Sequence, residues 1–193
     1  MASTKKTVLI IGSTRGIGLA FVEHYTKAGW NVIGTARANS NTEKLKALGP
    51  FKVVAMDTSD EASILKAARQ LDGQPIDLLI NNAGIGIPCE LETGTKDALM
   101  SQFEAGFGYG YSSSKAALNM ITRSLAFDLR SSGIVVVSVH PGYVDTDLTQ
   151  GKATVKPTDS VAAMTGLIAK LNPESTGKFF NLDPQIPVAE LPW

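Results

Sequence analysis

The stretch that decides the fold is Thr7-Val8-Leu9-Ile10-Ile11-Gly12-Ser13-Thr14-Arg15-Gly16-Ile17-Gly18. Its first five residues form an apolar run that predicts a buried strand over Thr7–Ile11. Apolar residues then recur at helical spacing from Ile17 to Tyr25, which predicts a helix over Gly16–Lys27 that stops at Gly29.

The glycines between this strand and this helix predict a phosphate-binding loop. Glycine is needed where the backbone turns tightly and approaches a pyrophosphate closely, and the unpaired N–H groups of a helix amino end attract the phosphate charge. The alternative is an ordinary glycine-rich turn, but the position after a strand and before a helix favours the loop. The residues expected to bind the dinucleotide here are Gly12, Ser13, Thr14, Arg15, Gly16, Ile17 and Gly18.

Two arginines indicate which dinucleotide is bound. A second strand is predicted over Asn31–Ala36, and proteins that bind NAD carry a carboxylate near the end of this strand for the ribose hydroxyls. Here Arg37 follows the strand instead, and Arg15 lies inside the loop. Guanidinium groups pair with phosphate, so the sequence favours NADP(H) over NAD(H); the alternative is that both are ordinary surface arginines.

Strands and helices continue to alternate along the rest of the chain. Further strands are predicted at residues 51–56, 76–80, 134–139 and 178–181, and further helices at residues 41–48, 59–71 (with Ser59 as N-cap), 111–131 and 158–171. This alternation predicts βαβ units and a mostly parallel sheet covered on both faces, which is an α/β fold of the Rossmann, doubly wound type. Because the chain has no repeat and no linker, residues 1–193 are expected to form a single domain.

The composition narrows the class of protein. The chain carries 18 Lys and Arg against 18 Asp and Glu, so it has no excess of positive charge for nucleic acid. Cys89 is the single cysteine, which excludes an intramolecular disulfide, leaves no zinc-finger spacing and fits a reducing compartment. The apolar runs are too short for a membrane span, so we expect a cytoplasmic protein without nucleic-acid, membrane or metal partners.

Three further motifs follow the glycine loop in chain order. They are Asn81-Asn82-Ala83-Gly84, Tyr111-Ser112-Ser113-Ser114-Lys115 and Pro141-Gly142-Tyr143-Val144-Asp145-Thr146. Together the four motifs resemble the short-chain dehydrogenase/reductase family, and especially its C-factor-like and carbonyl-reductase-like members, over nearly the whole chain. The resemblance implies that Asp57 contacts the adenine. It also implies cofactor contacts on the adenosine-ribose side from Asn82, Ala83 and Gly84, and on the nicotinamide side from Pro141, Gly142 and Thr146.

Tyr111 and Lys115 are the expected catalytic pair. They are four residues apart on a predicted helix, so their side chains share one face. A phenol with a pKa near ~10 is a poor base at neutral pH, and a neighbouring ammonium is expected to lower that pKa. In the resembled family, such a tyrosine exchanges a proton with the substrate oxygen and the lysine also binds the nicotinamide ribose. The alternative is a chance pair on a helix surface.

The interval between the second and third motifs is short. Only 26 residues, 85–110, separate Gly84 from Tyr111, whereas the family has a helix, a strand and a loop there that supply an asparagine and a serine to the site. We predict a short helix over residues 95–105, no strand after it, and no counterpart of that asparagine or serine. One βα unit is therefore expected to be missing, with the strands at 76–80 and 134–139 becoming neighbours. The alternatives are that segment 85–110 or a second chain fills the gap.

The leading hypothesis is an NADP(H)-dependent oxidoreductase that interconverts a carbonyl and an alcohol, with Tyr111 as acid/base. Loss of one donor to a developing oxyanion lowers rates by about 10²–10³-fold, so weak or lost activity is part of this hypothesis. The alternative is a non-catalytic protein that binds NADP(H) or serves as a scaffold for a partner. His140 is expected to have a packing or hydrogen-bonding role, and the family's usual dimer interface is in doubt because it includes the shortened segment.

Overall fold

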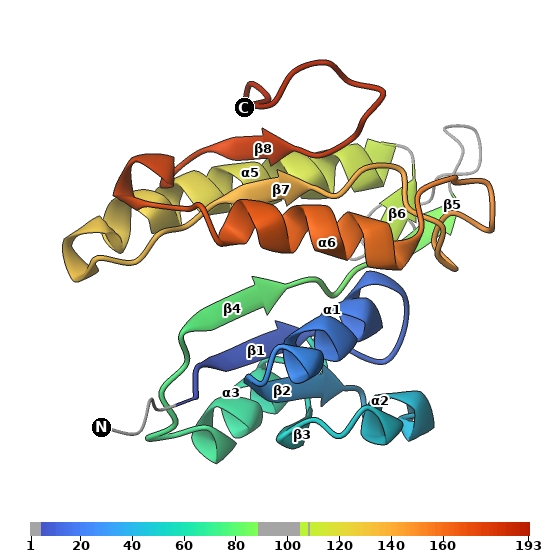
Figure 1. Cartoon of the computed structure of the whole chain (residues 1–193), viewed down its shortest axis with the longest axis vertical. Coiled ribbons are helices and arrows are strands. Elements are labelled where there is room, and N and C mark those ends of the chain that lie inside the picture. Colours follow the sequence, from blue (N-terminus) through green and yellow to red (C-terminus); the bar gives the residue numbers. More distant parts are fainter. Residues whose placement is uncertain (1–4, 89–104, 108) are drawn as a thin grey trace. The chain divides into compact units, whose positions relative to one another are not determined.

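The computed structural model describes residues 5–88, 105–107 and 109–193 (Figure 1). The chain divides into two compact units, residues 1–83 and residues 84–193, and each is described by itself. The single domain expected from the sequence stays a prediction.

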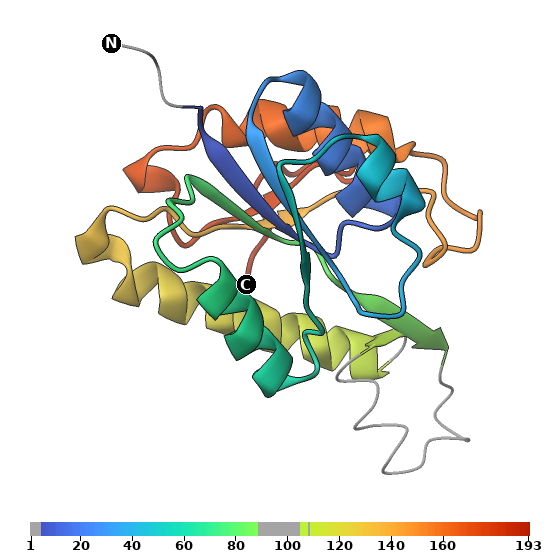
Figure 2. The same ribbon diagram turned by 90° about the horizontal axis from the view of Figure 1, so that it is seen from below.

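The first unit is a parallel sheet with helices on both faces. Its strands are β1 (Thr7–Ile11), β2 (Asn31–Ala36), β3 (Lys52–Ala55) and β4 (Leu78–Asn81), in the order β3-β2-β1-β4. Helices α1 (Gly16–Lys27) and α2 (Glu43–Ala47) cover one face, and α3 (Glu61–Gln70) covers the other (Figure 2). This arrangement confirms the predicted α/β fold of the Rossmann type.

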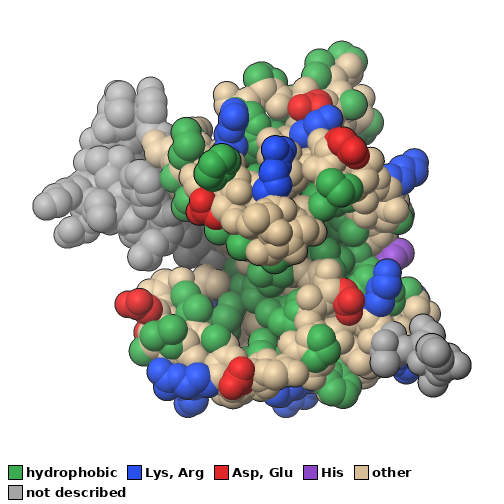
Figure 3. Space-filling model, turned by 90° about the vertical axis from the view of Figure 1, so that its left-hand side faces the viewer, with side chains coloured by type: hydrophobic (Ala, Val, Ile, Leu, Met, Phe, Trp, Pro, Cys, Tyr) green, Lys and Arg blue, Asp and Glu red, His purple; other side chains and the backbone are tan. Residues whose placement is uncertain are grey.

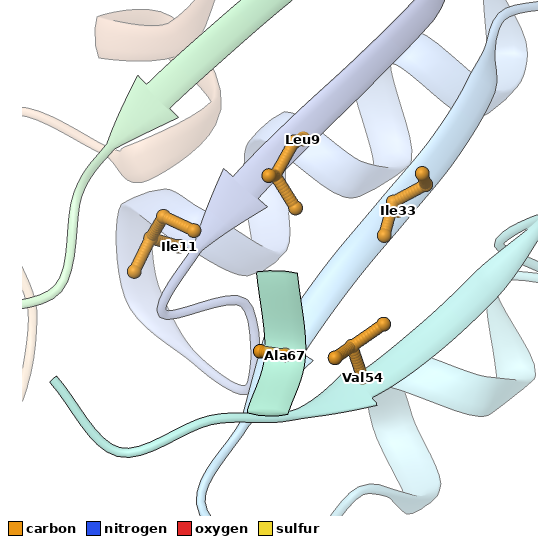
Figure 4. Packing of buried hydrophobic residues seen from close by; sticks show 5 residues of the cluster. All are labelled: Leu9, Ile11, Ile33, Val54 and Ala67. Carbon is orange, nitrogen blue, oxygen red and sulfur yellow. The ribbon is translucent and has the colours of Figure 1, made fainter. Parts of the chain in front are cut away.

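The core of the first unit follows from the alternation of side chains along its strands. All five residues of β1 are buried, as expected for a central parallel strand covered on both faces. On the face covered by α3, the buried cluster consists of Leu9, Ile11, Ile33, Val54 and Ala67 (Figure 4). Burial of each large aliphatic side chain in this cluster contributes about 1.5–3 kcal/mol to the free energy of folding. The cluster therefore stabilises the strands whose ends carry the expected site.

The ends of two helices test predictions made from single residues. After α1, the Trp30 N–H donates to the Tyr25 carbonyl and the Gly29 N–H to the Thr26 carbonyl, both at 3.0 Å, and Gly29 has φ +81°. This is a Schellman end, which confirms Gly29 as the helix stop. The predicted N-cap Ser59 is wrong, because Asp60 caps α3 by accepting the Ala62 N–H at 2.9 Å.

The second unit is built around two long helices and a pair of strands. Its elements after residue 108 are α5 (Tyr109–Asp128), the 3-10 turn η2 (Arg130–Ser132), β7 (Ser138–His140), α6 (Pro157–Ile168), the 3-10 turn η3 (Pro173–Ser175) and β8 (Phe179–Asn181). Strands β7 and β8 pair in parallel, and α5 and α6 lie on opposite faces of this pair (Figure 1 and Figure 2). The Ser138 hydroxyl donates to the Thr122 hydroxyl at 3.0 Å, which ties β7 to α5.

The shortened interval differs from its prediction. Strands β5 (Ile85–Pro88) and β6 (Ala105–Phe107) pair in parallel there, so the expectation of no strand was wrong. A glycine-containing segment gives no periodic side-chain signal, yet its backbone can pair as well as any other. Residues 95–104 of the predicted helix and Cys89 lie outside the described residues.

The predicted pairing of the strands at 76–80 and 134–139 would join the two compact units, so it stays a prediction. Within the first unit β4 pairs with β1, and within the second unit β7 pairs with β8. Strand β7 is shorter than predicted because regular pairing begins only at Ser138. Before it, the Val136 N–H donates to the Thr176 hydroxyl at 3.0 Å instead of joining a ladder.

The described surface carries mixed charge. On the face shown in Figure 3, Lys and Arg side chains are interspersed with Asp and Glu and do not gather into a patch of one sign. Among the helices of the described residues, none combines the length and the apolar character needed to cross a membrane.

Candidate functional site

The start of the glycine loop is attached to β2 by buried hydrogen bonds. The Ser13 N–H donates to the Thr35 carbonyl and the Ser13 hydroxyl accepts the Thr35 N–H, both at 3.0 Å. The same hydroxyl donates to the Ile10 carbonyl at 2.7 Å, and the Gly12 N–H donates to the Thr35 hydroxyl at 2.9 Å. Ser13 therefore shapes the loop, and Thr35 is a loop-holding residue that sequence reasoning missed because its partners are 22 and 23 positions away.

Two glycines of the loop allow it to pack on the second motif. Gly12 has φ +81°, and a Cβ there would lie 2.8 Å from the Ala83 Cα. A Cβ on Gly18 would overlap the Gly12 carbonyl oxygen and lie 2.6 Å from the Asn82 Nδ2. The Asn82 carboxamide also donates to the Gly12 carbonyl at 2.8 Å. The structure thus brings together Asn82 and Ala83 with the loop, although 70 positions separate Gly12 from Asn82.

The amino end of α1 has no side-chain cap hydrogen bond from its N-cap residue. Arg15 stands at the N-cap with extended backbone, offers no side-chain cap, and no acidic residue lies in the first turn. The amino end of α3 differs, because Asp60 caps it and Glu61 lies in its first turn. Uncapped N–H groups and the helix dipole favour an anion, so the residues present at α1 fit a diphosphate.

Arg37 and Asp57 follow the neighbouring strands β2 and β3. The Asp57 carboxylate accepts the Ser59 N–H at 3.0 Å and the Ser59 hydroxyl at 2.7 Å. These hydrogen bonds, and then the Arg37 guanidinium, lower the pKa of Asp57 below its usual value. At neutral pH this exposed group is an ionised acceptor, which suits the amino group of an adenine.

Tyr111 and Lys115 lie near the amino end of α5, as predicted. The Lys115 Nζ is 5.3 Å from the centroid of the Tyr111 ring, a cation–π distance. Burial raises the pKa of Tyr111, so the expected lowering by the ammonium is wrong for this structure. The ammonium lies over the ring, and partial removal of water lowers the pKa of Lys115 although the residue stays exposed. The phenol is therefore a proton donor at neutral pH.

The turn at Pro141 and Gly142 is held from two sides. Gly142 is buried with φ +86°, and its N–H donates to the His140 Nδ1 at 3.2 Å. From α6, the Ser160 hydroxyl donates to the Pro141 carbonyl at 2.7 Å. The hydrogen-bonding role expected for His140 is confirmed. Ser160 was missed, because a serine inside an amphipathic helix gives no sequence signal for a partner 19 positions away.

Thr146 lies in a loop closed by a second threonine. Its N–H donates to the Thr149 hydroxyl at 3.0 Å, and that hydroxyl donates in turn to the Val144 carbonyl at 2.9 Å. Thr149 is buried and was not singled out from the sequence. In α5, the Ser114 hydroxyl donates to the Tyr111 carbonyl at 2.8 Å.

The expected site residues fall into two groups, one in each compact unit. The first unit contains Gly12, Ser13, Thr14, Arg15, Gly16, Ile17, Gly18, Arg37, Asp57, Asn82 and Ala83. The second unit contains Gly84, Tyr111, Lys115, Pro141, Gly142 and Thr146. A pocket of about 340 Å³ in the C-terminal tail is lined by residues between Asn181 and Ala189, and none of the expected site residues lines it.

Comparison with known proteins identifies relatives along most of the chain. The family described as short chain dehydrogenase matches residues 6–108 and 99–156. C-signal of Myxococcus xanthus is 36% identical over 159 residues, covering 62% of this chain and 93% of the relative. Serine 3-dehydrogenase of Rhizobium radiobacter is 32% identical over 183 residues, covering 74% of each.

One further relative shows an internal difference in length. An oxidoreductase of Schizosaccharomyces pombe aligns at 26% identity over 247 positions, which cover 95% of this chain and 98% of that protein. An alignment of 247 positions leaves at least 54 without a counterpart in a chain of 193 residues. This chain therefore lacks residues that the relative has inside the aligned region.

Solved structures share the fold. Carbonyl reductase Sniffer of D. melanogaster superposes with a TM-score of 0.80 at 22% identity, covering 98% of this chain and all of the other. A short-chain dehydrogenase/reductase from Burkholderia multivorans with bound NADP also gives 0.80, at 23% identity, covering 92% and 96%.

Proposed function

The chain belongs to the short-chain dehydrogenase family, and from this premise we propose that it is an NADP(H)-dependent oxidoreductase interconverting a carbonyl compound and an alcohol. The observation that carries the proposal is the pair on α5, with the Lys115 ammonium 5.3 Å from the centre of the Tyr111 ring. The proposed substrate is a small molecule, and the proposed compartment is the cytoplasm because the single cysteine fits reducing conditions.

In the reductive direction, Tyr111 donates the proton that the substrate oxygen needs. When bound, the nicotinamide supplies the hydride for the carbonyl carbon, so hydride and proton together convert the carbonyl to the alcohol. Burial raises the pKa of Tyr111 and keeps its phenol protonated at neutral pH, which favours reduction over oxidation there. Lys115 offers its ammonium to the nicotinamide ribose, as the family resemblance implies.

The first unit is proposed to bind the adenosine and diphosphate half of the cofactor. Its support is the uncapped amino end of α1 and the loop whose Gly12 and Gly18 leave no room for a side chain. Arg37 is proposed to bind the 2′-phosphate, and Asp57 the adenine. The related structure from B. multivorans with bound NADP gives the same preference by analogy. In the second unit, Pro141, Gly142 and Thr146 are proposed to line the nicotinamide half.

The second candidate is a protein that binds NADP(H) without turnover. What favours it is the internal loss seen against the S. pombe relative, which we place between Gly84 and Tyr111. A site without its second donor to the substrate oxygen is expected to be slower by about 10²–10³-fold, and misplacement of the reacting groups would slow it further.

Titration of the protein with NADPH, followed by a panel of ketones, aldehydes and quinones, separates the candidates. An enzyme oxidises NADPH with at least one substrate, and Tyr111→Phe reduces kcat by about 10²–10⁴-fold with an unchanged Kd for NADPH. Tyr25→Phe is the matched control, because Tyr25 is a buried tyrosine of α1 that has no role in the proposed chemistry. Saturable binding without turnover supports the second candidate, and no binding by folded protein excludes both.

A further inference from the structure

Asn181, the last residue of β8, is a buried carboxamide that folds the loop after it. Its Nδ2 donates to the Val188 carbonyl at 2.9 Å and to the Ile186 carbonyl at 3.0 Å. Its Oδ1 accepts the Asp183 N–H at 3.0 Å. Asn181 is only 7% exposed, so these partners replace water on both ends of one side chain. One carboxamide thus joins the start and the end of the segment Asp183–Val188.

The tail beyond this loop is anchored along β8. The Asn181 N–H donates to the Ala189 carbonyl at 2.9 Å, and the Leu191 N–H donates to the Phe179 carbonyl at 2.8 Å. At the end of the chain, the Trp193 indole N–H donates to the Gly177 carbonyl at 3.0 Å. The returning tail lies beside β8 in Figure 1, so the loop is fixed at both ends.

The loop that Asn181 folds supports the turn at Gly142. A Cβ built on Gly142 would lie 3.6 Å from both the Asp183 Cα and the Leu182 carbonyl oxygen, which is van der Waals contact with backbone. The Leu182 N–H also donates to the carbonyl of His140, the residue whose imidazole holds the Gly142 N–H. A shift of the loop would therefore move both supports of this turn.

We propose that Asn181 is a positioning residue for the nicotinamide half of the cofactor, acting through the tail loop on which the Pro141–Gly142 turn rests. The inference depends on the proposed function, because that function assigns this turn to the nicotinamide side. The adenosine half is assigned to the first unit, where Asn181 has no part. The effect of Asn181 is therefore confined to the half of the cofactor that the second unit binds.

Binding of NADPH and of 2′,5′-ADP, which represents the adenosine half alone, tests this assignment by calorimetry. Asn181→Ala is expected to lower the affinity for NADPH by about tenfold and to change the affinity for 2′,5′-ADP by less than twofold. Asn181→Asp keeps the acceptor for the Asp183 N–H but places a carboxylate oxygen against two carbonyl oxygens. It should therefore lower the affinity for NADPH at least as much as Asn181→Ala does. Gln185→Ala is the matched control, since Gln185 is an exposed amide residue of the same loop.

A purely structural role of Asn181 would lower thermal stability without changing the ratio of the two affinities. An unchanged ratio in both Asn181 variants therefore overturns the inference while leaving the proposed function standing. A wild-type protein that binds neither ligand overturns the proposed function itself.

Hydrogen exchange of the wild-type protein gives a second measurement that does not depend on folding of a variant. NADPH is expected to increase protection of residues 182–189, and 2′,5′-ADP is expected to leave it unchanged. Protection that is equal with the two ligands, or absent with both, contradicts the inference.

Discussion

The two compact units hold their expected site residues in different ways. In the first unit the loop rests on a central strand whose residues are all buried, and Ser13 and Thr35 join it to β2 through buried hydrogen bonds. In the second unit the turn at Gly142 depends on a partly buried hydrogen bond from α6 and on backbone contacts with the tail. Helix α5 leaves Met120 65% and Phe127 83% exposed. The residues proposed to bind the adenosine half of the cofactor therefore rest on a fully buried strand. The residues proposed for the nicotinamide half lie on elements that keep large side chains exposed.

Gly18→Ala is expected to have the largest effect, because it disrupts the packing of the glycine loop in the first unit. The new methyl group would overlap the Gly12 carbonyl oxygen, so α1 must move away from β1. We expect a loss of about 3 kcal/mol in the free energy of unfolding, measured in urea, together with loss of 2′,5′-ADP binding. Gly166→Ala in α6 is the control, since nothing lies within 4 Å of a Cβ there. Equal stability of the two variants would contradict the structure of the loop.

Arg37→Ala should alter the choice of cofactor within the first unit. A charge-assisted hydrogen bond to the 2′-phosphate contributes about 1.5–3 kcal/mol, so the affinity for NADPH should fall by about 10–100-fold. The affinity for NADH, which lacks that phosphate, should change little. Calorimetric titration of both nucleotides measures the difference, with the exposed Arg69→Ala as control. If the affinities for NADPH and NADH fall equally, Arg37 does not bind the 2′-phosphate.

The pH dependence of reduction tests the second unit. Burial raises the pKa of Tyr111 above its ordinary value near 10, so the protonated phenol persists at neutral pH and is lost only as pH rises through that raised value. We expect kcat/KM for carbonyl reduction to change less than about twofold between pH 6 and 8 on account of this group. Steady-state kinetics with a substrate from the panel measures the profile. A tenfold fall per pH unit beginning near pH 7, retained in variants at other tyrosines, would show that Lys115 lowers the pKa of Tyr111 instead.

Phe127→Ser should have the smallest effect, and it tests whether the exposed side chains of α5 contribute to stability. Since Phe127 is largely exposed, its replacement should change the free energy of unfolding by no more than about 0.5 kcal/mol. The measurement is the urea midpoint at two protein concentrations. A clear, concentration-dependent destabilisation would instead mean that another copy of the chain covers this part of α5.

Sequence reasoning was most successful where the signal is local. The bounds of β1, α1 and β2 agree with prediction, since their apolar spacing and the Gly29 stop are read within a few residues. It failed at Ile85–Pro88 and Ala105–Phe107, because the short strands β5 and β6 pair through backbone groups that every residue type has. It also failed for the pKa of Tyr111, because spacing shows that Lys115 is near but does not show how much water remains around the phenol.

The sequence by itself determined the fold class, the family and the order of the four motifs. These follow from the local spacing of apolar residues and from the chemistry of glycine, arginine, tyrosine and lysine. Only the tertiary structure decided what holds those motifs. Thr35 under the loop, Asn82 on Gly12, Ser160 on Pro141 and Asn181 in the tail all act across long separations in sequence. Such contacts depend on which segments fold against one another, and neither the spacing nor the type of a residue records that choice.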